Sequence, residues 1–302
     1  MNVQPRLIAN YRCQTGEGPM WHPEEAALYW MDIPRGRLFR YDPARDEHVI
    51  VREGGELGAF TVQADGTLLL MGGPGCAVSR WKDGQEAEVV SKVPGETRFN
   101  DAIADAAGRV YSGTMPRRWG TTDPAELGSL YRIDRDGSIH VMDRGFGCAN
   151  GMGLTPDGGT LFFIDSPSQN VYAYDVDPAT GDLSNRRVHF VTNARAASGL
   201  PPLDGVPDGM TLDADGCFWI ARYGGSCVVR YDPAGIEMGR VELPTPCITS
   251  VGFGGPDLAT MYITSAGSDD PAKHGPEAGT LFAVELEGVR GVPEHRSRIT
   301  FS

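Results

Sequence analysis

The sequence predicts an all-β protein folded as a six-bladed β-propeller with four-stranded antiparallel blades and a central metal site. Runs rich in Val, Ile, Phe, Tyr and Trp are bounded throughout by 40 glycines and 22 prolines, which is typical of short strands joined by tight turns. One type of segment recurs six times in 302 residues. The repeat length is therefore close to the 40 to 50 residues of a four-stranded propeller blade.

Each repeat has a polar or glycine-rich approach, a turn such as PDGG or ADGT, an apolar strand, a second turn and a strand that often ends in YDP or ID. No change of composition and no linker divides the chain, so we expect residues 1–302 to form one propeller domain. The copies are HPEEAALYWMDIPRGRLFRYDP (22–43), QADGTLLLMGGPGCAVSRW (63–81), DAAGRVYSGTMP (105–116) with GSLYRIDRDG (128–137), TPDGGTLFFIDSPSQNVYAYDVDP (155–178), DADGCFWIARYGGSCVVRYDPAG (213–235), and GGPDLATMYITSAG (254–267) with GTLFAVELEG (279–288).

Both ends of the chain carry a candidate strand, PRLIANY near the start and HRSRITF at the finish. Closing the ring of blades removes exposed strand edges. We therefore expect one chain end to complete a blade that the other end begins.

Charge and hydropathy exclude several classes of partner. With 27 Lys and Arg against 40 Asp and Glu, the net charge is −13, which would repel a nucleic acid backbone. No run of about 18 apolar residues could span a bilayer, and no apolar stretch follows the amino terminus. We expect a cytoplasmic protein without membrane or nucleic acid partners, and the sequence does not indicate its oligomeric state.

The six cysteines are scattered without CxxC pairs or metal-ligand spacing, so we expect mostly buried free thiols. The six histidines form no HxH or HExxH group, and no nucleophile elbow, Walker loop or dinucleotide fingerprint is present. The chemistry must come from other residue types.

Four repeats carry an acid or amide eight residues ahead of a matching turn position. Taken singly, each residue has an ordinary explanation, because NG and DG are common turn dipeptides and a Glu between two glycines is commonly a solvated loop carboxylate. The shared register instead favours a functional cluster, since equivalent positions of radially arranged repeats point to one central place. The residues are Glu17, Asn100, Asn150 and Asp208.

Two carboxylates and amide oxygens form a hard ligand set that suits Ca²⁺, Mg²⁺ or Mn²⁺, and Zn²⁺ or Fe²⁺ if water completes the shell. Without a cation, Glu17 and Asp208 in one place would force one carboxylate to take up a proton. Arg98, two residues before Asn100, places a cationic donor near this site or forms a surface salt bridge. Asp101 should point away along the strand.

The chain resembles the gluconolactonase and regucalcin (senescence marker protein) family of six-bladed propeller lactonases. The resemblance rests on GEGPMWHPEEAALYWMDI, RFNDAIADAAGRVYSGTM, NGMGLTPDGGTLFFIDS and VPDGMTLDADGCFWIA, and covers nearly the whole chain. It implies one divalent metal ion held by Glu17, Asn150 and Asp208, with substrate contacts from Arg98 and Asn100. In the loop PRRWGTTDPAELG, a substrate-binding glutamate of the family corresponds to Glu126 only with a shift.

The resulting hypothesis is metal-dependent hydrolysis of a sugar lactone, such as gluconolactone, to the aldonic acid, with Asp208 as the general base for the attacking water. A non-catalytic propeller that binds calcium or a small ligand is one alternative, and a phosphotriesterase-like hydrolase is another. A site sealed from solvent would favour the binder, and an apolar pocket without Arg98 would favour the phosphotriesterase. The sequence names neither the lactone, its ring size nor the metal.

Overall fold

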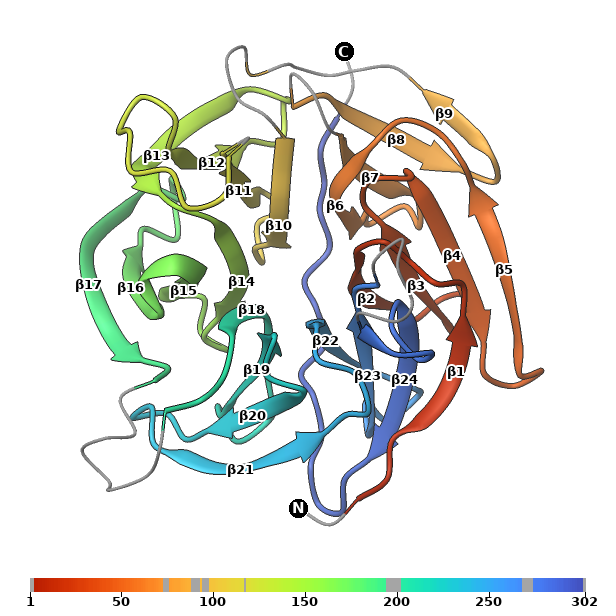
Figure 1. Cartoon of the computed structure of the whole chain (residues 1–302). Helices are drawn as coiled ribbons and strands as arrows, with labels where there is room; N and C mark the ends of the chain where they lie inside the picture. Colours follow the sequence, from red (N-terminus) through yellow and green to blue (C-terminus); the bar gives the residue numbers. More distant parts are fainter. Residues whose placement is uncertain are drawn as a thin grey trace.

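Six four-stranded antiparallel sheets are arranged around a central axis in the computed structural model (Figure 1). It describes residues 3–72, 76–87, 93, 98–116, 118–193, 202–267 and 274–300. Each of the six innermost strands contacts the innermost strands of both neighbouring blades, which closes the ring. The predicted six-bladed propeller is confirmed. The innermost strands are β2 (Gly16–His22), β6 (Leu57–Val62), β10 (Arg98–Ala104), β14 (Ala149–Leu154), β18 (Val206–Leu212) and β22 (Ile248–Gly254).

The next two strands of each blade carry most of the core. The second strands are nearly continuous apolar runs, as in ALYWMD and TLFFID, because neighbouring blades cover both of their faces. The second strands are β3 (Ala27–Asp32), β7 (Leu68–Gly72), β11 (Val110–Met115), β15 (Thr160–Asp165), β19 (Phe218–Tyr223) and β23 (Thr260–Ser265). The third strands are β4 (Arg37–Asp42), β8 (Val78–Lys82), β12 (Gly128–Ile133), β16 (Asn170–Val176), β20 (Cys227–Tyr231) and β24 (Thr280–Glu285).

The outermost strands are more polar and largely exposed, since one side of each faces solvent. Their charged residues reduce pairing with other chains. They are β5 (Glu47–Arg52), β9 (Gln85–Ala87), β13 (Ile139–Phe146), β17 (Leu183–Val191), β21 (Glu237–Glu242) and β1 (Arg6–Asn10).

The amino-terminal strand closes the ring. β1 pairs antiparallel with β24 and becomes the outermost strand of the blade formed by β22, β23 and β24. The prediction that one chain end completes a blade begun by the other is confirmed. The other candidate strand, HRSRITF, is not a strand over its described residues 295–300.

Residues 289–300 instead form a strap that runs across the central axis of the propeller (Figure 1). Its backbone bonds several blades in turn, with Gly291 N donating to Leu258 O at 2.9 Å and Ser297 N donating to Val62 O at 3.0 Å. Further along, Arg298 N donates to Gly108 O at 2.9 Å. The strap therefore ties blades that are distant in sequence across the axis.

Two glycines next to site residues allow the innermost strands to approach closely. A Cβ on Gly151 would lie 2.4 Å from Met210 Cβ, and one on Gly209 would lie 2.2 Å from Ser250 Oγ. The NG and DG dipeptides lie inside β14 and β18 and form no turns, so the ordinary turn explanation for them is wrong. Glycine is required there because neighbouring blades leave no room for a side chain.

All six cysteines are free and buried, as expected. In the part of the chain that the structure describes, no helix is long and apolar enough to cross a membrane.

Candidate active site and metal centre

The polar residues with shared register meet at one end of the central channel. They lie near the starts of β2, β10, β14 and β18, and all four side chains line one cavity of about 300 Å³. Arg98 lines the same cavity, whereas Glu126 does not. The remaining lining residues are Thr15, Ile33, Met115, Trp119, Cys148, Ser166, Val206 and Tyr223.

A break in strand register occurs at each of these positions. In β2 the pairing with β3 shifts between Glu17 and Met20, and in β14 the pairing with β15 shifts between Asn150 and Met152. Comparable shifts follow Phe99 in β10 and Pro207 in β18. Bulges of this kind bend a strand and redirect its side chains. The repeated irregularity therefore aims the four polar side chains at the axis.

The two carboxylates are buried, and the neighbouring Arg98 compensates their negative charge only in part. Glu17 and Asp208 are 6% and 7% exposed. Burial, followed by the negative charge of Asp208, raises the pKa of Glu17 well above its usual range. Burial, followed by the charge of Asp101, does the same to the pKa of Asp208, and Arg98 only partly opposes this. Both carboxyl groups would be stabilised as anions by a cation between them.

A divalent ion fits this donor set. Within the part of the chain that the structure describes, the Glu17 carboxylate accepts one hydrogen bond, from the adjacent Gly18 N–H at 3.1 Å, so Glu17 has lone pairs available for a cation. Among the residues described by the structure, no three His, Cys, Asp or Glu side chains are grouped to hold an ion. The Asn150 amide lines the same cavity as the two carboxylates, and oxygen donors of these kinds are those that hard cations prefer.

A chain of short hydrogen bonds connects Arg98 with Asn150. Arg98 Nη1 donates to Asn100 Oδ1 at 2.6 Å, and Asn100 Nδ2 donates to Ala149 O at 2.6 Å and to Asn150 Oδ1 at 2.7 Å. Since guanidinium only donates and carbonyl oxygen only accepts, these partners fix the orientation of the Asn100 amide. Asn150 Nδ2 in turn donates to Ser166 Oγ at 2.8 Å. Asn100 thus holds the Arg98 guanidinium group on one side and the Asn150 amide on the other.

Glu126 lies outside this group and braces the loop after β11. Its carboxylate accepts from Arg118 Nη2 at 3.0 Å and from Thr121 Oγ1 at 2.6 Å. Among the described residues of this loop, Trp119 borders the cavity. Sequence reasoning missed Trp119, although an aromatic residue in the polar segment RRWGTT was an available signal.

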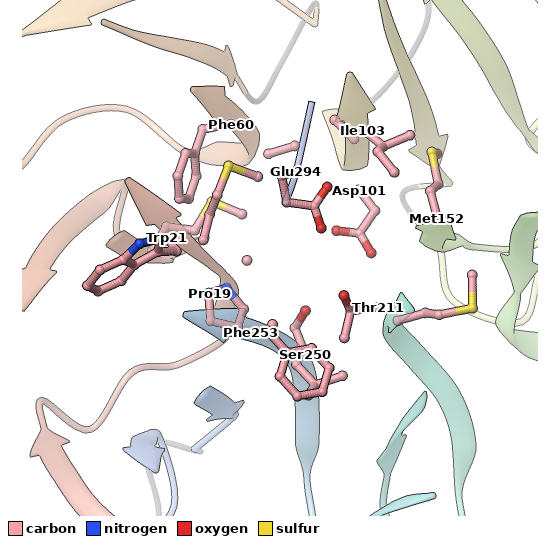
Figure 2. A pocket seen from close by; sticks show the side chains of 18 residues that line it. Pro19, Trp21, Phe60, Asp101, Ile103, Met152, Thr211, Ser250, Phe253 and Glu294 are labelled. Carbon is pink, nitrogen blue, oxygen red and sulfur yellow. The ribbon is translucent and has the colours of Figure 1, made fainter. Parts of the chain in front are cut away.

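Further along the innermost strands lies a second cavity of about 60 Å³ (Figure 2). Asp101 and Glu294 both line it, together with the hydroxyl-bearing residues Thr211 and Ser250. Asp101 therefore faces away from the larger cavity, as strand alternation predicts. Burial raises the pKa of Asp101 to about 6. Glu294 belongs to the strap, and it lines this cavity and two neighbouring ones.

Comparison with known proteins identifies the family. Residues 15–267 match the family described as SMP-30/Gluconolactonase/LRE-like region. The chain belongs to this family. A relative named pentonolactonase XacC, from Haloferax volcanii, is 42% identical over 97% of this chain and 97% of its own length. Regucalcin of Bos taurus is 33% identical over 97% of this chain and 98% of its own length.

A solved structure supports the family assignment. This SMP-30/gluconolactonase chain superposes with a TM-score of 0.85 on a calcium-binding protein, regucalcin, from Agrobacterium tumefaciens. The two chains are 25% identical, and the match covers 98% of each. The likeness extends over all six blades, so it includes every strand that carries a candidate site residue.

Proposed function

We propose that this chain hydrolyses a sugar lactone to its aldonic acid, with a divalent ion held by Glu17, Asn150 and Asp208. One observation carries the proposal. Two buried carboxylates with raised pKa values lie with an amide in a cavity that also contains a guanidinium group. The names of the relatives, pentonolactonase among them, support lactone hydrolysis.

A divalent ion at this position supplies Lewis-acid polarisation of the ester carbonyl and lowers the pKa of water. In the proposed reaction Asp208 accepts a proton from the attacking water as the new bond to the carbonyl carbon forms. The ester C–O bond of the ring then breaks, and Asp208 returns the proton to the departing ring oxygen. The product is one open chain that carries a free hydroxyl and a carboxylic acid, which then loses its proton to water.

Arg98 and Asn100 would position the substrate. Arg98 is held through Nη1 by Asn100 and by Phe99 O at 3.0 Å, so its cationic group has a fixed place in the cavity. Fixed donors reduce the entropic cost of placing the ester beside the carboxylates. Both Asn100 polar atoms already bond the protein, so we propose that its contribution is chiefly to order Arg98 and Asn150.

The cavity favours an enzyme over the two alternatives. Trp119 and Tyr223, which border it, are 55% and 39% exposed, so the site is open to solvent rather than sealed around an ion. Arg98 lines the cavity together with two carboxylates, which differs from the apolar pocket expected of the phosphotriesterase alternative. A small polyhydroxylated ester matches both the polar groups and the volume.

The test is a metal-stripped sample supplied with Ca²⁺, Mg²⁺, Mn²⁺, Zn²⁺ and Fe²⁺ one at a time. Acid release from a panel of pentono- and hexonolactones is followed against the spontaneous rate. We expect hydrolysis that depends on the added ion and that is lost in Glu17→Gln. The matched control is Glu53→Gln, which changes an exposed carboxylate outside the cavity. If the wild-type protein releases acid no faster than the spontaneous rate with every ion, the result would instead support the non-catalytic binder.

A further inference from the structure

Trp119 is an exposed aromatic residue at the edge of the candidate active site. Its side chain lines the cavity, and the residue is 55% exposed. The other four tryptophans are buried, at 7% exposure or less. Ligand pockets are commonly lined by aromatic side chains, and an indole exposed at the edge of a cavity is available to contact a ligand there.

The loop holds Trp119 in place through a closed turn. Thr121 N donates to Arg118 O at 3.2 Å, and Gly120 has φ of +74°, which suits the third position of a type II turn. Trp119 therefore occupies the second position, at the tip. Glu126 bonds both flanking residues of the turn, Arg118 and Thr121, and so limits movement of the tip.

The cavity is lined by two chemically different kinds of side chain. Its charged and amide groups come from the innermost strands, and its lining also includes the apolar or aromatic side chains of Trp119, Ile33, Met115, Val206 and Tyr223. A ligand that suits both kinds of side chain carries hydroxyl and ester oxygens as well as exposed C–H groups. A cyclic sugar lactone has this character, because its ring presents C–H groups that match the negative face of an aromatic system.

We infer that Trp119 is a specificity-determining residue whose indole packs against the C–H face of the sugar lactone ring. The inference rests on the proposed function, since it names how that substrate is recognised. It also gives the loop after β11 a role in which Trp119 contacts the ligand and Glu126 positions the turn.

The kinetic test compares wild type with Trp119→Ala and Trp119→Phe in the metal-loaded protein. Loss of an aromatic contact should raise KM for an aldonolactone about three- to tenfold and change kcat less than about twofold. Trp119→Phe keeps an aromatic face and should recover most of the lost affinity. Ile236→Ala is the matched control, because Ile236 is 63% exposed and does not line the cavity.

Tryptophan fluorescence provides a second measurement that does not need turnover. An indole in water emits at longer wavelength than a buried one, so covering Trp119 should shift the emission to shorter wavelength and protect it from acrylamide. Pentonate and gluconate, the reaction products, serve as probes. Trp119→Phe should abolish the shift, since the four remaining tryptophans are buried.

The two measurements separate failure of this inference from failure of the proposed function. If wild type hydrolyses lactones but Trp119→Ala keeps the wild-type KM and the products cause no fluorescence shift, the inference is overturned and the function stands. If wild type hydrolyses no lactone, the proposed function fails, and the fluorescence response to the aldonates alone decides the role of Trp119. A raised KM that Trp119→Phe does not restore would also overturn aromatic packing.

Discussion

Asp208→Asn should make the metal-free protein at least as stable as wild type while removing its response to metal. Most substitutions of buried residues destabilise a fold. Here the substitution keeps the side-chain shape and removes one of two buried carboxylates that repel each other. We therefore expect Asp208→Asn to lose activity while its stability without metal equals or exceeds that of wild type.

The pH dependence has a definite sign. Asp208 and Glu17 both have pKa values raised above those of the unfolded chain, so the folded state binds more protons. The free energy of unfolding of the metal-free wild type should therefore fall as pH rises from about 4, the unfolded carboxyl pKa, through the raised folded values. Asp208→Asn removes one of these groups and relieves the other, so its curve should be flatter.

The response to metal can be given a size. An ion present at about 100 times its dissociation constant stabilises the folded state by about 2.7 kcal/mol. For 302 residues the entropy of unfolding is about 0.6 kcal/mol per degree near the transition, so wild type should gain about 4 °C in Tm. Asp208→Asn, which lacks one ligand charge, should gain far less.

The assay is thermal unfolding of both proteins in a chelator and in each divalent ion, across a pH series, together with lactone hydrolysis. Turnover of the variant should drop at least about 100-fold, as expected for loss of a general base. An equal Tm gain in wild type and variant would remove Asp208 from the ion site. Near-normal turnover would remove it from the mechanism.

Three further substitutions test the surrounding structure. Gly209→Ala should lower the free energy of unfolding, measured by urea titration, by about 1–3 kcal/mol, because the added Cβ would lie 2.2 Å from Ser250 Oγ. The control Gly159→Ala should change the free energy of unfolding little, since the nearest atom to its added Cβ lies 3.4 Å away. Arg98→Ala should lower kcat/KM for lactones at least about tenfold, since it removes the cationic donor and frees the amide it holds; an unchanged value would exclude substrate positioning. Ser297→Ala should lower Tm by about 2–5 °C, because it removes the hydrogen-bond partner of the buried Thr61 hydroxyl. An unchanged Tm would show that this contact of the strap adds no stability.

Local patterns were sufficient to predict the architecture and the axial residues. Apolar second strands, glycine-bounded turns and a fixed repeat length indicated six blades, and β1 completes the last blade as expected. The equivalent positions of Glu17, Asn150 and Asp208 in the repeats indicated one shared cavity. These features are predictable because strand alternation and repeat register depend only on neighbouring residues.

Contacts between distant segments decided the rest. Gly151 and Gly209 lie within strands, where the neighbouring blades leave no room for a side chain. The local sequence around them is the same as that of a turn, so it could not predict this environment. The same holds for Trp119, which borders the cavity while Glu126 faces its own loop. Thus the sequence determined the blades and the polar residues facing the axis. The tertiary structure determined which loop and terminal side chains border the cavities, because their positions depend on packing against residues far away in the chain.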